Sequence, residues 1–167
     1  MNTDIANMTN KYLTFVLATE EYAVDILRVQ EIKGWNKITT IPNTPHYICG
    51  VINLRGTIVP IIDLRMRFNL ERLEYGPMTV VVVVKVIASK SKERTMGIVV
   101  DAVSDVYDVS EIDIKPPPDF GSFICTEFIK GLTTVDNKMV IVLDIDRLLN
   151  SNELAIVENA SEQASNG

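Results

Sequence analysis

GVINLRGTIVPIIDL, residues 50–64, joins two apolar, β-branched runs through the short polar segment NLRG. Such runs, bounded by Asn and Gly, are typical of two strands and a tight hairpin turn. A similar pattern returns at residues 131–145, GLTTVDNKMVIVLDI, at an offset of 81 residues. Gly50, Val59 and Asp63 each meet the same residue type in the second copy. The hairpin therefore predicts a duplicated β structure.

An earlier segment supports the duplication. VDILRVQEI (24–32) resembles VDAVSDVYDV (100–109) with one inserted residue, in the same order and at nearly the same offset. The chain also holds 20 Val and 19 Ile among 167 residues, a composition that favours strands. We predict an all-β fold with short helices, built as two similar units that each close into a small barrel. Closure would protect the apolar run TVVVVVKVI (79–87) from edge-to-edge aggregation.

Helical signals are few. DILRVQEI (25–32) and DIDRLLN (144–150) could each form a turn or two, and NELAIVENA (152–160) follows a possible cap at Ser151. KITTIP (37–42) is interpreted as a strand. The expected organisation is a flexible N-terminus at 1–10, a domain at 11–150 with repeat units 11–76 and 77–150, and a C-terminal helix with an acidic tail at 151–167.

The composition argues against several functions. A net charge of −6 does not suit a general phosphate-backbone binder, so no nucleic acid is expected. Cys49 and Cys125 are interpreted as free thiols, and the lone His46 has no neighbours at zinc-ligand spacing. Glycine-rich phosphate loops and nucleophile elbows are missing from the sequence. We therefore expect no enzyme, no catalytic residue, no cofactor and no metal.

The expected location is the cytoplasm. The opening MNTDIANMTN lacks the basic and apolar regions of a signal peptide, and Lys85 interrupts the longest apolar run. That run is about half the length a spanning helix needs, so no direct membrane insertion is expected.

Arg55, within NLRG, is the strongest local signal for function. Turn geometry explains Asn53 and Gly56 but does not require an arginine, and the aligned residue in the second copy is Asp136. Three interpretations stay open: a solvated side chain, an ion pair with an acid such as Asp63, or a fork of donors presented to a partner's carboxylate. Three basic residues follow the hairpin, Arg65, Arg67 and Arg72, and are interpreted as a solvated face. Asp101 is interpreted as a solvated turn residue.

From about Tyr12 to Leu149 the chain resembles the CheW-like family of bacterial chemotaxis coupling proteins. The resemblance is carried by EEYAVDILRVQEI (20–32), IPNTPHYICGVINLRGTIVPIIDLRMRF (41–68), GIVVDAVSDV (97–106), IKGL (129–132) and DRLLNS (146–151). The segment GVINLRGTIVPIIDLR is the most specific of these. Relatives in which the domain is fused to a kinase or receiver domain are less completely matched.

The resemblance implies two five-stranded SH3-like barrels packed on a shared core. It also implies a non-enzymatic adaptor that joins the regulatory domain of the histidine kinase CheA to the tips of methyl-accepting chemoreceptors, recruited to membrane-bound arrays. The adaptor would be monomeric or weakly self-associating on its own. The implied receptor and kinase interface comprises Val29, Glu31, Ile32, Gly50, Asn53, Leu54, Arg55, Gly56, Val99 and Val106.

One alternative is an SH3- or OB-type barrel that binds nucleic acid or a small ligand. Such a module needs exposed aromatic side chains over a basic groove. Trp35, in IKGWNK, is the only aromatic residue flanked by lysines. A salt-dependent affinity for polyanions would distinguish this alternative from an adaptor.

Overall fold

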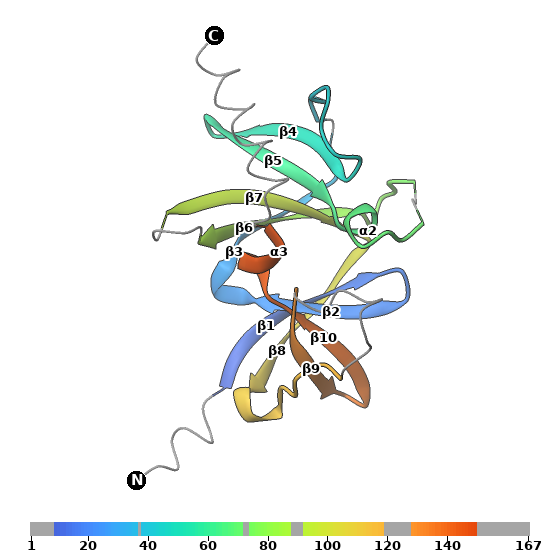
Figure 1. Cartoon of the computed structure of the whole chain (residues 1–167), viewed down its shortest axis with the longest axis vertical. Coiled ribbons are helices and arrows are strands. Elements are labelled where there is room, and N and C mark those ends of the chain that lie inside the picture. The colour runs from blue at the N-terminus through green and yellow to red at the C-terminus, as the bar shows by residue number, and fades with distance from the viewer. Residues whose placement is uncertain (1–8, 37, 72–73, 88–91, 119–127, 150–167) are drawn as a thin grey trace.

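The computed structural model describes residues 9–36, 38–71, 74–87, 92–118 and 128–149. Within these ranges the strands form two five-stranded sheets (Figure 1). We call them the β1 sheet, with order β8-β1-β2-β10-β9, and the β6 sheet, with order β3-β6-β7-β5-β4. The strands of the β1 sheet are β1 (Thr9–Leu17), β2 (Glu20–Asp25), β8 (Ala102–Ser110), β9 (Ile129–Val135) and β10 (Lys138–Leu143). Those of the β6 sheet are β3 (Val29–Gly34), β4 (Ile48–Leu54), β5 (Thr57–Asp63), β6 (Val80–Ile87) and β7 (Glu93–Val100).

The duplication is visible in the strand pairing. Each sheet holds an antiparallel hairpin, β4–β5 or β9–β10, whose second strand pairs in parallel with a further strand. In the β6 sheet Ile61 lies opposite Gly97, and in the β1 sheet Val142 lies opposite Ala23. Ile61 and Val142 are 81 residues apart, so the offset read from the sequence is also the offset between the two sheets.

The sheets do not follow the sequence bounds 11–76 and 77–150. The strands β1 and β2 complete the sheet that contains β8, β9 and β10. The next strand, β3, pairs with β6 and belongs to the other sheet. Each sheet therefore takes strands from both halves of the chain. The five strands of the β6 sheet are nevertheless consecutive, from Val29 to Val100, and lie in the chain between β2 and β8 of the β1 sheet.

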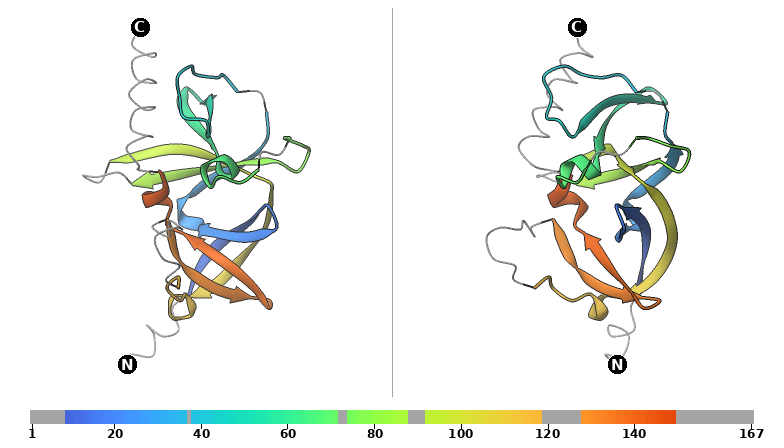
Figure 2. Two further views of the ribbon diagram at one scale, coloured as in Figure 1. Left: turned by 45° about the vertical axis from the view of Figure 1, so that its right-hand side comes forward. Right: turned by 90° about the vertical axis from the view of Figure 1, so that its right-hand side faces the viewer.

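The two sheets share one hydrophobic core. Its fully buried side chains include Phe15 and Val24 of the β1 sheet, Val82 and Ile98 of the β6 sheet, and Leu148 of α3 (Ile145–Leu149). Figure 2 shows α2 (Leu64–Arg67) and α3 at the junction between the sheets. The predicted fold class, all-β with two packed five-stranded units, is confirmed at the level of two packed five-stranded sheets.

The two short helices begin in the same way. The Asp63 carboxylate accepts a hydrogen bond from Met66 N at 3.3 Å, and the Asp144 carboxylate accepts one from Arg147 N at 3.1 Å. An aspartate at this position satisfies a backbone donor that the first turn leaves without a partner. The prediction of a turn beginning at Asp144 is confirmed.

Three other local predictions need correction. Residues 25–32 form only a 3-10 turn, η1 (Ile26–Arg28), and then the strand β3, because pairing with β6 overrides the helical spacing. Within KITTIP the described residues make a single bridge, Thr39 to Val51. β1 begins at Thr9, inside the segment expected to be flexible. The predicted helix at 152–160 lies outside the described residues.

Candidate partner-binding surface around Glu31 and Arg55

The hairpin β4–β5 turns through two residues, Arg55 and Gly56, because Leu54 pairs with Thr57. Both turn residues have positive φ, 51° and 90°. The Asn53 side-chain oxygen accepts a hydrogen bond from Gly56 N at 2.8 Å and holds the turn closed. Asn-Gly is the preferred pair for such a turn, whereas an arginine at positive φ is uncommon. The prediction that turn geometry explains Asn53 and Gly56 but not Arg55 is therefore confirmed.

The Arg55 guanidinium forms an ion pair with Glu31. Its Nη2 lies 2.8 Å from Glu31 Oε2; the arginine side chain is 77% exposed and the glutamate side chain 22%. Glu31 lies on β3 and Arg55 follows β4, which are the two edge strands of the β6 sheet. The 2.8 Å contact therefore joins side chains from the two edges of the sheet directly to each other. Most of the arginine side chain still faces solvent, where a partner can reach it.

The alternative of an ion pair with an acid of this chain is confirmed, but the acid is Glu31 and not Asp63. Asp63 is buried at 4% exposure, and its Oδ2 accepts a hydrogen bond from the Tyr75 hydroxyl at 2.6 Å. Its other oxygen caps α2. Asp63 thus fixes the end of β5 and the start of the helix, not the hairpin turn.

Apolar side chains of β3 lie on the face opposite the Glu31 side chain, because Ile32 pairs with Val82 of the shared core and Glu31 pairs with Val83 of the cluster inside the β6 sheet. Ile32 is 44% exposed, whereas Val29 is half-buried and packs on the shared core. A register irregularity between Val29 and Glu31 interrupts the ladder with β6. Beyond the pair, a cleft of about 180 Å³ is lined by the end of β3, the middle of β4 and the segment between them; its residues are Lys33, Gly34, Asn36, Ile38, Thr39, Val51, Ile52, Asn53 and Val81.

Not all the predicted interface residues reach this surface. Leu54 and Val99, exposed by 9% and 3%, belong to the apolar cluster inside the β6 sheet, so their side chains are unavailable to a visiting protein in this conformation. Gly50 is also buried, because the backbone of Thr39 crosses where a side chain would stand. Val106 is 43% exposed but lies on β8, in the other sheet. The structure brings together Glu31, Asn53, Arg55 and Gly56, whereas the side chains of Val29 and Ile32 lie on the other face of β3.

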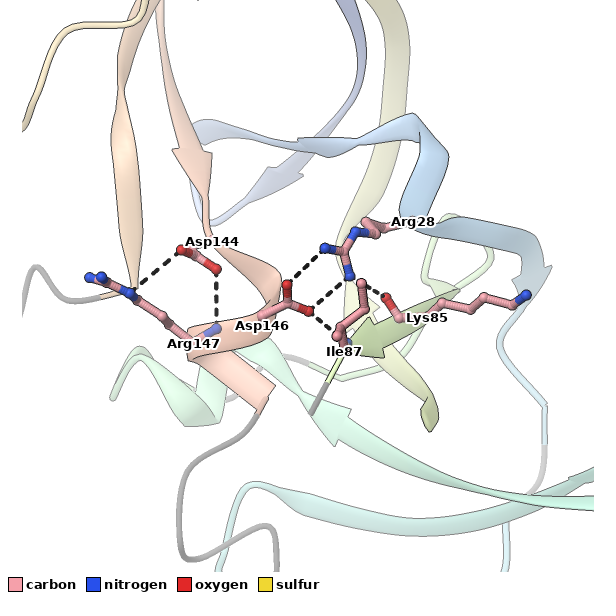
Figure 3. Close-up of polar contacts among 6 residues, drawn as sticks. All are labelled: Arg28, Lys85, Ile87, Asp144, Asp146 and Arg147. Atoms are coloured by element: carbon pink, nitrogen blue, oxygen red, sulfur yellow. Dashed lines mark hydrogen bonds and ion pairs between the residues drawn. The ribbon is translucent and has the colours of Figure 1, made fainter. Parts of the chain in front are cut away.

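Sequence reasoning missed two ion pairs at the junction of the sheets, which we call the seam pairs. Arg65 donates twice to Asp101, at 2.7 Å each, and Arg28 donates twice to Asp146, at 2.9 and 2.8 Å (Figure 3). The interpretation of Arg65 and Asp101 as solvated residues is wrong. Arg67 is not solvated either, because its guanidinium lies over the ring of Phe128.

The electrostatics of the Arg65–Asp101 pair agree with its geometry. Burial alone would raise the pKa of Asp101, but hydrogen bonds from Arg65 and from Ala18 N hold that pKa below its ordinary value. The hydrogen bond to Asp101 raises the pKa of Arg65. Both groups are thus charged at neutral pH. The duplication could have pointed to these pairs, since positions 65 and 146 align at the offset of 81.

A second cavity, of about 340 Å³, lies on the other side of the segment that joins β3 to β4, and Trp35, His46, Cys49, Asp63 and Tyr75 are among its lining residues. Its polar groups bind one another: the Tyr75 hydroxyl donates to Asp63 and lies 3.5 Å from the Cys49 thiol. Burial and the bond to Asp63 raise the pKa of Tyr75 far above its usual value. Cys49 keeps its thiol and forms no disulfide, as predicted.

The ligand-binding alternative depends on Trp35, whose ring already packs against another aromatic ring of the chain. Trp35 is half-buried, and its ring centroid lies 3.9 Å from that of Tyr75. Among the described residues, no group of three or more His, Cys, Asp or Glu side chains could hold a metal ion. The same part of the chain contains no helix that is both long and apolar enough to cross a membrane.

These features describe a β protein of two fused sheets that presents an exposed charged hairpin beside an edge strand. Comparison with known proteins identifies the family. The family model for the CheW-like domain matches residues 11–153, and the chain belongs to that family.

The relatives cover nearly the whole chain. "Chemotaxis protein CheW" of Klebsiella aerogenes is 45% identical over 91% of this chain and 89% of its own length. The CheW protein of Bacillus subtilis is 31% identical over 90% of this chain and 94% of its own length. The crystal structure of the scaffolding protein TtCheW from Thermoanaerobacter tengcongensis superposes with a TM-score of 0.76 at 36% identity, covering 87% of this chain and 91% of that one.

Proposed function

We propose that this chain is a non-enzymatic adaptor of bacterial chemotaxis that couples chemoreceptor tips to the histidine kinase CheA. Membership of the CheW-like family supports this role, as does similarity to a protein described as a scaffold. The adaptor works in the cytoplasm and reaches the membrane only through receptor arrays. It changes no covalent bond; it acts by holding two partners at a fixed separation.

The exposed Arg55 on a closed turn is the observation that carries the proposal. A receptor tip is a helical hairpin, and a helix with an apolar face docks on exposed apolar side chains such as Ile32. On the opposite face of the same edge strand, Glu31 and Arg55 offer both signs of charge, 2.8 Å apart. Charges at the rim of an interface set orientation and association rate more than affinity. The β3 surface therefore receives the receptor, and the ion pair fixes its register.

A second docking region suits the kinase. Ile58 on β5 and Met139 on β10 occupy equivalent positions in the two hairpins, and they are 42% and 58% exposed. An apolar side chain on each hairpin gives the chain a binding position at both ends. We assign the regulatory domain of CheA to these ends, with the receptor bound at β3. Weak contacts at several positions, added together, can hold an array that no single contact would hold.

Reconstitution of the full chain with receptor-tip fragments and CheA tests the proposal. The parent chain should bind both partners and raise kinase activity when receptors are present. Arg55→Ala should lose receptor-dependent activation and melt like the parent, because exposed side chains change stability by about 0.5 kcal/mol or less. Lys11→Ala, which removes an exposed cation paired with Asp108 in the other sheet, is the matched control and should remain active. If the parent binds neither partner, or Arg55→Ala couples normally, the proposal fails.

A further inference from the structure

The seam pair Arg28–Asp146 joins three segments of the chain. The guanidinium of Arg28, in η1, binds both oxygens of Asp146, in α3, and Asp146 Oδ1 also accepts a hydrogen bond from Ile87 N at 2.8 Å (Figure 3). Ile87 ends β6. The two charged side chains are only 25% and 30% exposed. A half-buried pair with two parallel hydrogen bonds is directional, so it fixes where its two segments lie.

The other seam pair has the same design with reversed charges. Positions 65 and 146 are equivalent in the duplication, yet one carries arginine and the other aspartate. Arg65 binds Asp101, which also accepts from Ala18 N at 2.9 Å, so this pair too joins three segments. Both pairs link a short helix to the passage of the chain from one sheet to the other. Opposite polarity disfavours mispairing, since exchange of the equivalent segments would bring like charges together.

Only one seam pair adjoins the proposed receptor surface. Arg28 immediately precedes Val29, the first residue of β3, and Glu31 follows within the same strand. β3 is an edge strand that pairs only with β6, and its ladder is irregular just after Val29. The beginning of β3 is therefore held by few backbone hydrogen bonds. The ion pair at Arg28 holds this part of the strand in place.

We propose that the Arg28–Asp146 pair is the positioning element for partner binding at β3. This inference rests on the proposed function, because it assigns the receptor to β3. Arg28 and Asp146 do not touch the receptor; they hold the strand that does. Since α3 follows β10 directly, the pair also ties the docking strand to the last strand of the other sheet. A displacement of β3 by a bound partner is thereby transmitted to both sheets.

Amide variants of the full-length chain test this role. Asp146→Asn removes the charge but keeps an oxygen for Ile87 N, and Arg28→Gln removes the guanidinium. Each should weaken binding of a purified receptor-tip fragment by about tenfold, a typical size for a coupled charged pair. The double variant should bind no worse than either single variant, because the two residues act through one contact. Arg28→Lys keeps the cation and should recover most of the affinity.

The second seam pair supplies the matched control. Arg65→Gln removes a guanidinium of similar burial, 14% exposed, that does not precede a docking strand. It should lower the melting temperature at least as much as Arg28→Gln while receptor-tip affinity stays within about twofold. Binding to the CheA regulatory domain should be unchanged in all variants. Equal loss of receptor affinity from both seam pairs, or none from Arg28→Gln, overturns the inference. Absence of receptor binding by the parent chain would instead overturn the proposed function.

Discussion

Arg55→Asn should make the hairpin more favourable and the protein inactive. Arg55 has φ of 51°, and a left-handed conformation costs an ordinary residue about 1–2 kcal/mol, of which asparagine avoids a large part. Against this gain stands the ion pair with Glu31. Its arginine side chain is 77% exposed, and exposed pairs contribute about 0.2–1 kcal/mol. The free energy of unfolding should therefore stay equal or rise, by about 1 kcal/mol at most.

The second hairpin shows that the backbone accepts such a change. Asp136 and Asn137 occupy the equivalent turn at φ of 50° and 65°, and both residue types tolerate this conformation well. The second hairpin therefore carries residues that suit its positive-φ turn, whereas the first hairpin carries an arginine that suits the same turn poorly. Local strain that the fold does not require points to a function for the residue that causes it.

Two measurements on one variant test this reasoning. Urea unfolding gives the stability of Arg55→Asn, and reconstituted kinase activation gives its coupling. Asp136→Asn, at the equivalent turn position, is the control and should keep both properties. The reasoning is refuted if Arg55→Asn loses more than about 1 kcal/mol, since the arginine would then be holding the sheet together. Normal coupling by a stable Arg55→Asn would refute it equally.

Two further predictions concern the core and the seam. Ile61 is fully buried inside the β6 sheet, so Ile61→Ala should lower the free energy of unfolding by about 2–5 kcal/mol in urea titrations, and a loss under about 1 kcal/mol would contradict tight packing there. The pKa of Asp101 is lowered in the folded state, so its stabilisation is complete above the unfolded value of about 3.9 and is lost as the pH falls below it. In the Asp101→Asn variant the free energy of unfolding should therefore decrease less between about pH 5 and pH 2 than in the parent. The same decrease in both proteins would show that the seam pair does not contribute to stability in this pH range.

Local chemistry made the hairpins predictable from sequence. The turn at Asn53 and Gly56 and the turn that begins at Asp144 both follow from neighbouring residues, and each is present in the structure. The duplication also shows that the turn does not require an arginine at position 55, because only one copy of the repeat carries it. These features depend on separations of a few residues, where turn and capping preferences decide the outcome.

Long-range partners could not be anticipated in this way. Arg65 and Asp101 are 36 residues apart, and nothing near either residue indicates the other. Leu54 and Val99 stand in family motifs, but alternation alone does not say which face of a strand meets the core. The strand β3 was partly interpreted as helix because its apolar spacing suits both structures, and pairing with β6 settles the choice.

The exchange of strands between the two halves explains why the adaptor can be rigid without a large interface between separate domains. A chain limited to residues 11–76 would hold β3, β4 and β5 but lack β6 and β7, on which β3 and β5 pair. The remaining half would lack β1 and β2, which connect β8 to β10. Neither half therefore holds a complete sheet, and the two sheets share one core. An adaptor built in this way presents β3 and both hairpins in one fixed arrangement, which is the property that joining two partners demands.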